Sequence, residues 1–112
     1  TVGLARDPRE LPHVHVIDTD LEQGGMARLY RTADAFVLPT RGEGWGRPQA
    51  EAMAMGLPTI VTNWSGPTAF MTEENAYPLR VAALEPMATS DPQLEAEGHL
   101  WALPDIQHLR EL

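Results

Sequence analysis

Cysteine is absent from this 112-residue chain, which excludes a disulfide framework, a thiolate zinc site and a cysteine nucleophile. Basic residues are scarce: eight Lys and Arg face sixteen Asp and Glu, for a formal net charge of −8. This charge repels nucleic-acid phosphates and anionic membrane surfaces, so neither is an expected partner. The sequence also lacks an apolar run near the roughly 20 residues that span a bilayer, and it lacks a signal-peptide pattern. We therefore expect a cytoplasmic protein with no membrane segment in this chain.

The remaining composition is that of an ordinary globular domain. Hydrophobic residues make up 43% of the chain, which is enough for a core, and 112 residues suit one domain. The chain begins at Thr1 rather than Met and stops at Leu112 inside an expected helix. We therefore expect residues 1–112 to be part of a longer protein, truncated at both ends.

The first half of the chain predicts two strands joined by a helix. A β-prone run at residues 13–18 follows two prolines and predicts a strand. Apolar residues at helical spacing after the Gly24-Gly25 pair predict a short helix that leads into a second strand at residues 35–39. Because that second strand is apolar throughout, we expect it to be buried on both faces of a parallel sheet.

The second half continues the alternation. A loop at residues 40–47 leads into a helix at residues 48–55, with Pro48 in its first turn and Gly56 as its stop. Strands are predicted at residues 58–62 and 77–81, separated by a long loop. We expect a turn-rich acidic stretch from there to about residue 98, and a closing turn and helix with Asp105 as N-cap. This order of elements is typical of an α/β fold with a parallel sheet.

The loop at residues 40–47 is the candidate binding site. Ligands of open parallel sheets bind beyond the carboxyl ends of the strands, where this loop is expected. Its glycines, Gly42, Gly44 and Gly46, let the backbone approach a ligand closely, and the first amides of the next helix can bind an anionic group. A diphosphate is the ligand that this combination favours.

Two carboxylates accompany the loop. Glu43 lies in it and Glu51 lies eight positions later in the helix, so both could face one crevice and accept hydrogen bonds from ribose and sugar hydroxyls. Alternatively, Glu51 only complements the helix dipole and Glu43 is a solvated loop residue. The spacing alone favours the second interpretation, since such pairs are common by chance.

The sequence around Glu43 and Glu51 favours the first interpretation, a role for both in binding. Residues 43–61 read Glu-Gly-Trp-Gly-Arg-Pro-Gln-Ala-Glu-Ala-Met-Ala-Met-Gly-Leu-Pro-Thr-Ile-Val. This string resembles the Glu-x7-Glu signature of family 4 retaining glycosyltransferases (group 1), which have the GT-B fold. Residues 29–39 before it and Ser65-Gly66 after it are also similar to the family pattern. The resemblance covers about residues 25–81 and implies a Rossmann-like parallel sheet that is part of the C-terminal, donor-binding GT-B domain.

The resemblance also implies a role for each matching residue. Glu43 would be the catalytic position that faces the transferred sugar, and Glu51 would bind the ribose of a nucleoside-diphosphate sugar. No cofactor and no metal are implied, and the acceptor is unknown. An isolated chain of this kind would be inactive, because the acceptor domain of a hexosyltransferase-like enzyme lies outside it. The other donor-binding positions would be Gly44, Trp45, Gly46 and Arg47.

Two alternatives to a sugar-transferring enzyme stay open. The chain could be a non-catalytic nucleotide-sugar-binding module that keeps the crevice without the chemistry. It could also belong to another GT-B-like enzyme, such as an epimerase or a phosphorylase, whose acid and base residues would lie elsewhere. The sequence names neither the sugar nor the base of the donor, nor the acceptor.

Weaker signals favour structural roles. Asp18 and Asp20 match a metal-binding Asp-x-Asp pattern, but we favour a strand end and an N-cap, with Gln23 completing a capping box. His13 and His15 share a predicted strand face without a third ligand nearby, so no metal is assigned.

Three further residues could contribute to binding. Trp64 and Trp101 could stack on a base or a sugar, but burial in the core is the favoured interpretation. In the resembling family a glutamate often follows the turn that matches Ser65-Gly66. Glu73 is a distant candidate for that position.

Overall fold

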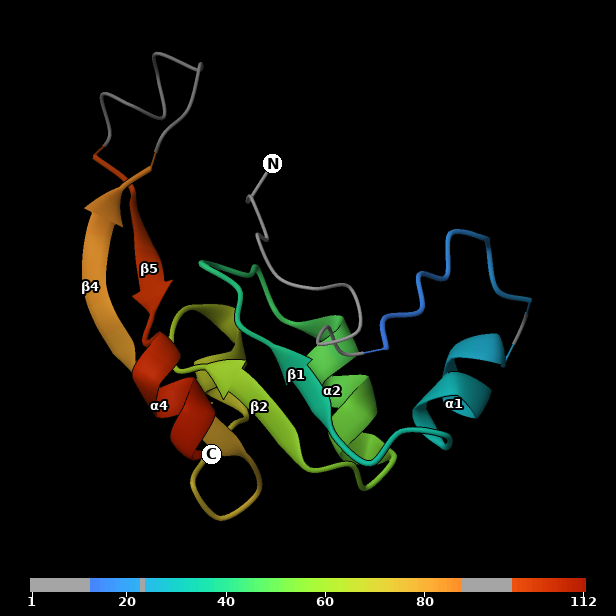
Figure 1. Ribbon diagram of the computed structural model, residues 1–112. Helices are drawn as coiled ribbons and strands as arrows, with labels where there is room; N and C mark the ends of the chain where they lie inside the picture. The colour runs from blue at the N-terminus through green and yellow to red at the C-terminus, as the bar shows by residue number, and fades with distance from the viewer. Residues whose placement is uncertain (1–12, 23, 88–97) are drawn as a thin grey trace.

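The structure is a computed structural model that describes residues 13–22, 24–87 and 98–112. Three parallel strands form its sheet in the order β1-β2-β3: β1 (Phe36–Leu38), β2 (Thr59–Thr62) and β3 (Tyr77–Leu79). Helix α2 (Arg47–Ala54) connects β1 to β2, and the 3-10 helix η2 (Gly66–Ala69) lies between β2 and β3 (Figure 1). The predicted α/β class with a parallel sheet is confirmed.

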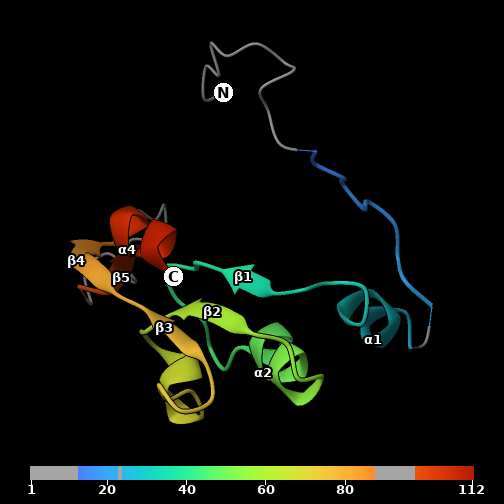
Figure 2. The same cartoon turned by 60° about the horizontal axis from the view of Figure 1, so that its bottom comes forward.

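Helix α2 packs on one face of the sheet, while helix α4 (Ile106–Glu111) lies on the other side (Figure 2). The start of α2 is set by Gly46, whose left-handed backbone at φ 94° suits glycine, and by the proline that follows in the first turn. The predicted helix at residues 48–55 therefore agrees with α2 to within one residue at each end. The core consists of Val61, Met71 and Ala76, with Phe36, Met53 and Phe70 packed against it.

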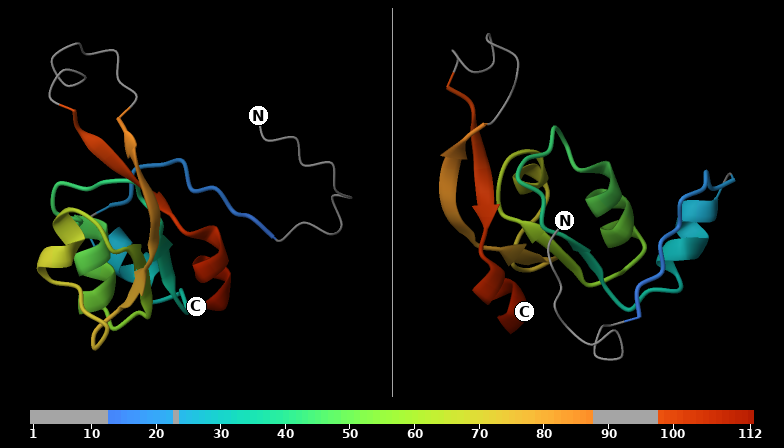
Figure 3. Two further views of the ribbon diagram at one scale, coloured as in Figure 1. Left: turned by 90° about the vertical axis from the view of Figure 1, so that its left-hand side faces the viewer. Right: turned by 45° about the horizontal axis from the view of Figure 1, so that its top comes forward.

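Beyond β3 the chain departs from the expected acidic loop. Strand β3 passes almost directly into β4 (Val81–Pro86), which pairs antiparallel with β5 (Leu100–Pro104). This β4–β5 hairpin projects beyond the carboxyl end of the parallel sheet (Figure 3). The prediction of a turn-rich stretch was wrong for residues 82–86, because residues 83–86 pair with residues 100–103, which lie 14–20 positions further along the chain. The closing helix is confirmed, and its N-cap Asp105 accepts hydrogen bonds from the amides of Gln107 and His108.

The predicted strand at residues 13–18 is not formed. The segment runs outside the sheet before helix α1 (Gly25–Tyr30), and Val14 and Val16 are 75% and 83% exposed. Strand β1 is therefore an edge strand in the described part of the chain. Its central Val37 is 48% exposed, so the prediction of burial on both faces was also wrong. Phe36 and Leu38 alternate with Val37 and are partly buried.

No helix within residues 13–22, 24–87 and 98–112 is long and apolar enough to cross a bilayer.

Candidate functional site

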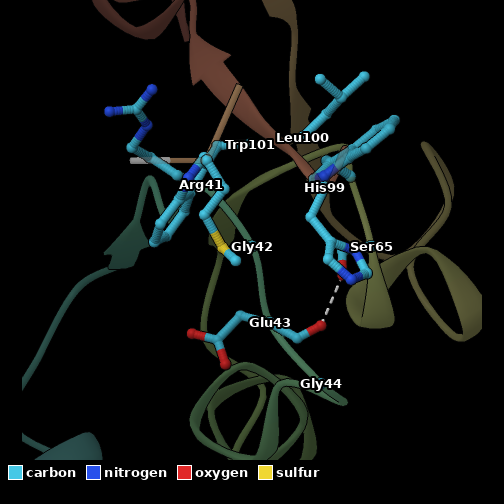
Figure 4. Close-up of a pocket in the computed structure, with 10 residues that line it drawn as sticks. Arg41, Gly42, Glu43, Gly44, Ser65, His99, Leu100 and Trp101 are labelled. Carbon is cyan, nitrogen blue, oxygen red and sulfur yellow. Dashed lines mark hydrogen bonds between the residues drawn. The ribbon is translucent and has the colours of Figure 1, made fainter. Parts of the chain in front are cut away.

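The loop that follows β1 borders a hollow of about 340 Å³ at the carboxyl end of the sheet. Figure 4 shows Glu43 on one wall of this hollow, with Ser65 and His99 on one side and Arg41 and Trp101 on the other. The walls come from three places: the loop after β1, the turn after β2 and the β4–β5 hairpin. The complete lining is Arg41, Gly42, Glu43, Gly44, Trp64, Ser65, Met87, His99, Leu100 and Trp101.

The turn after β2 fixes the backbone at Glu43. The Ser65 hydroxyl donates to the Glu43 carbonyl at 2.7 Å, and the Gly66 amide donates to the same oxygen at 3.0 Å. A Cβ on Gly66 would lie 2.6 Å from the carbonyl carbon of Gly44 and 2.7 Å from the Cα of Trp45. The loop and the turn can approach this closely only because residue 66 is glycine.

Ser65 has an unusual backbone for a residue with a side chain. Its φ of 64° and ψ of −147° lie close to a region that glycine occupies almost alone. Such a conformation costs of the order of 1–3 kcal/mol and persists where the surrounding structure imposes it. The bond from its hydroxyl to Glu43 offsets part of this cost.

The β4–β5 hairpin holds the other end of the loop through Arg41. The Ala102 amide donates to the Arg41 carbonyl at 2.8 Å, and Arg41 Nε donates to the Ala102 carbonyl at 3.3 Å. The guanidinium also pairs with Glu85 and lies 5.5 Å from the ring centroid of Trp101, a cation–π distance. The loop is thus tied to the hairpin by main-chain and side-chain contacts together.

Glu51 lies in a second hollow, of about 390 Å³, between helices α1 and α2. This hollow is largely apolar apart from Glu51 and the Tyr30 hydroxyl, which donates weakly to Glu51 Oε2 at 3.5 Å. Burial, and then the nearby Glu51 carboxylate, raise the pKa of Tyr30. The two predicted carboxylates line different hollows, and these hollows have no residue in common.

The remaining predicted residues surround the amino end of α2. Arg47 reaches Glu51 at 3.6 Å across one helical turn, but its side chain is 84% exposed, so this ion pair is weak and the guanidinium can reorient. Trp45 packs against Phe70 with ring centroids 5.1 Å apart and is not among the residues that line the first hollow. No side chain caps the helix at Gly46.

Gln49 is buried at this helix start without a hydrogen-bond partner. It is fully buried beneath the loop, and neither its Nε2 nor its Oε1 has a partner. An added Cβ on Gly46 would meet this amide at 3.1 Å and Pro67 at 2.9 Å. The space under the loop is therefore filled by a polar side chain without a protein hydrogen-bond partner.

The weaker signals show no assembled metal site. Asp18 and Asp20 line a recess of the exposed 13–22 segment, and His13 and His15 are exposed as well. The described residues contain no group of three His, Asp or Glu side chains placed to hold a metal. The expected N-cap is not Asp20, because α1 is preceded by Gly24, and the expected capping partner, Gln23, lies outside the described residues.

Sequence reasoning missed several residues of the first hollow. Trp64 and Trp101, interpreted as core residues, are only partly buried and line the hollow beside Ser65 and His99. Trp64 lies just after a predicted strand, but Trp101 had no such signal, because the hairpin that brings it to the loop was not predicted. Glu73, the distant candidate, lies in another hollow with Gly56 and does not line the one that contains Glu43.

Comparison with known proteins identifies a synthase and a glycosyltransferase as relatives. Over 52 residues the chain is 46% identical to the mannosylfructose-phosphate synthase of Agrobacterium fabrum, an alignment that covers 46% of this chain and 10% of that protein. Over 79 residues it is 30% identical to the capsular polysaccharide biosynthesis glycosyltransferase CapM of Staphylococcus aureus, covering 63% of this chain and 21% of that protein. The matched part of the chain thus spans about a tenth of the length of the first relative and about a fifth of the length of the second. No solved structure matches significantly.

The family described as "Glycosyl transferases group 1" matches residues 3–92, which is most of the chain and includes the loop, helix α2 and the turn after β2. The chain belongs to the group 1 glycosyl transferases.

Proposed function

We propose that this domain binds the nucleoside-diphosphate sugar of a family 4 retaining glycosyltransferase and that Glu43 acts at the sugar. The observation that carries the proposal is the arrangement around the amino end of α2. Glu43 lies in one hollow, Glu51 lies in another, and the uncapped start of the helix separates them along the chain. Along the chain the order is therefore Glu43, the helix start and Glu51. A donor has three chemically distinct parts that would match this order: sugar, diphosphate and nucleoside.

The diphosphate suits the helix start. The first amides of a helix have no acceptor within the helix, and the helix dipole favours negative charge there. Gly46 gives this helix no side-chain cap, so a phosphate oxygen would not have to displace one. The exposed Arg47 guanidinium can turn from Glu51 to a phosphate at little cost.

The nucleoside side suits the hollow of Glu51. Carboxylate oxygens accept hydrogen bonds from the two vicinal hydroxyls of a ribose. Tyr30 already donates to Glu51 Oε2 and leaves Oε1 to the weak pair with Arg47. The apolar walls that Met26 and Met55 contribute would accommodate the less polar parts of a nucleoside.

In the proposed reaction the bond between the anomeric carbon and the diphosphate breaks, and the diphosphate leaves with the electron pair. A new bond forms between that carbon and the acceptor oxygen, and the acceptor's proton passes to the departing diphosphate. Attack and departure occur on one face of the sugar, so configuration is retained. Glu43 would orient the sugar as its charge changes, and the start of α2 would stabilise the charge on the departing diphosphate.

Substituting the two glutamates in the intact protein tests this proposal. Glu51→Gln removes a charge-assisted bond worth roughly 1.5–3 kcal/mol, so the KM for the donor should rise tenfold or more. Glu43→Gln should mainly lower kcat, because its interaction strengthens as the sugar changes geometry. Steady-state kinetics with the donor give both constants.

Glu73→Gln is the matched control, since it removes an exposed carboxylate of another hollow and should leave both constants unchanged. If Glu43→Gln and Glu51→Gln both stay within twofold of the parent, the proposal is wrong. Donor binding without any turnover in the intact protein would instead indicate a non-catalytic module.

A further inference from the structure

The β4–β5 hairpin completes the hollow that contains Glu43. We infer that Trp101 on this hairpin and Trp64 after β2 form an aromatic seat for the sugar ring of the donor, so that the hairpin helps to select the sugar. This inference rests on the proposed function, because it assigns the sugar end of the donor to the first hollow.

The lining of this hollow matches the chemistry of a sugar ring. A sugar presents apolar C–H faces and a rim of hydroxyls, and indole rings pack against the former while carboxylates and hydroxyls bond to the latter. Trp64 and Trp101 supply the indoles, and Glu43 and Ser65 supply the polar groups. A mostly apolar lining with a few polar groups is the usual composition of a small-molecule site.

The charge of the hollow disfavours a diphosphate there. Arg41 is the one Arg or Lys among the described residues that line it, and its guanidinium is already engaged by Glu85 and by the Ala102 carbonyl. Glu43 adds negative charge. An uncharged polyhydroxyl ring can enter this hollow without an opposing charge, whereas a diphosphate would need one.

The hairpin holds Trp101 in a defined position. Trp101 is opposite Glu85 in the β4–β5 register, and the next residue, Ala102, bonds to the Arg41 main chain of the loop. The Arg41 guanidinium lies over the indole ring. Trp101 is therefore fixed relative to Glu43 by strand pairing and by the loop itself, and a fixed wall can discriminate between sugars that differ in shape.

Binding measurements on the intact protein test the inference. The probes are three matched pairs: UDP with UDP-glucose, GDP with GDP-mannose, and ADP with ADP-glucose. For the pair that binds, Trp101→Leu and Trp64→Leu should weaken the sugar nucleotide at least tenfold and change the bare diphosphate less than twofold, as measured by isothermal titration calorimetry. Leu84→Ala is the control, because Leu84 is an exposed residue of the same hairpin that does not line the hollow.

A second measurement needs no substitution and covers a variant that fails to fold. In saturation-transfer difference spectra of the unmodified protein, the protons of the sugar ring should receive as much saturation as those of the base. Two results would assign the indoles to the base and overturn the inference. One is a strong base signal with a weak sugar signal in these spectra. The other is an equal loss of affinity for both members of the pair in the tryptophan variants.

The two proposals fail in different ways. If Glu51→Gln weakens the bare diphosphate while both tryptophan variants bind the sugar nucleotide normally, the aromatic seat is wrong and the proposed function stands. If the intact protein binds no member of the three pairs, the proposed function and the inference are both wrong.

Discussion

At the scale of single residues, Ser65 combines a costly backbone with a useful hydroxyl. Ser65→Ala should lower the free energy of unfolding by about 0.5–1.5 kcal/mol, because it keeps the strained conformation and loses the bond to Glu43. Ser65→Gly also loses the bond but relieves the strain, so the glycine variant should be more stable than the alanine variant by roughly 1–3 kcal/mol. Chemical denaturation of the two variants provides the comparison. An alanine variant that is the more stable of the two would show that the backbone at residue 65 is not strained.

At Gln49, a buried polar residue, we expect a substitution to raise the stability rather than lower it. Its amide has no partner although the side chain is fully buried, so the protein bears the desolvation cost without a compensating bond. Gln49→Met keeps a similar length and removes that cost, and should raise the free energy of unfolding by about 1–3 kcal/mol. Denaturant unfolding measures the change. A loss of stability would mean that the amide is bonded in solution, for example by a buried water.

At the scale of elements, helix α4 should respond to pH through its cap. Asp105 accepts bonds from the His108 and Gln107 amides and from Arg80, and these lower its pKa below the ordinary value of 3.8. A carboxylate whose pKa is lower in the folded state stabilises the fold above the unfolded pKa and loses that contribution as pH falls through the folded one. Asp105→Ala should therefore lower Tm near neutral pH, and the difference from the parent should shrink below about pH 4. A constant difference across that range would show that the charge of the cap is unimportant.

The elements also show why prediction succeeded in some places and failed in others. Helix α2 and strands β1 and β2 were predicted, because a glycine, a proline and a local apolar pattern determine them. The β4–β5 hairpin was not, because its pairing joins residues far apart in the chain, and the predicted turn-rich stretch included residues 82–86. For the same reason Glu43 and Glu51 could be selected from a local string, whereas Trp101 could not. Residues 13–18 had a strand pattern, but a strand also needs a neighbour to pair with.

At the scale of the whole molecule, the described sheet has two open edges. Strands β1 and β3 each pair within the sheet only with β2, and Val14, Val16 and Ile17 are exposed in the segment that precedes helix α1. Unpaired edges and exposed apolar residues favour association between chains. The purified 112-residue chain should therefore be marginally stable and associate as its concentration rises. We also expect it to show no sugar transfer, because it spans only about a tenth and a fifth of its relatives. Sedimentation velocity and a donor-consumption assay test this. A monomer with a sharp cooperative transition near 5–15 kcal/mol, or detectable turnover, would contradict it.

The contacts that hold the loop after β1 also affect how fast a ligand can bind. The carbonyls of Arg41 and Glu43, on either side of Gly42, both accept hydrogen bonds from other elements. Little backbone freedom is then left to lose when a donor arrives, which reduces the entropic cost of association. Without a loop to close, the observed binding rate should rise in proportion to donor concentration and show no plateau. A loop whose two carbonyls are held by hydrogen bonds therefore favours fast donor binding without a closing motion.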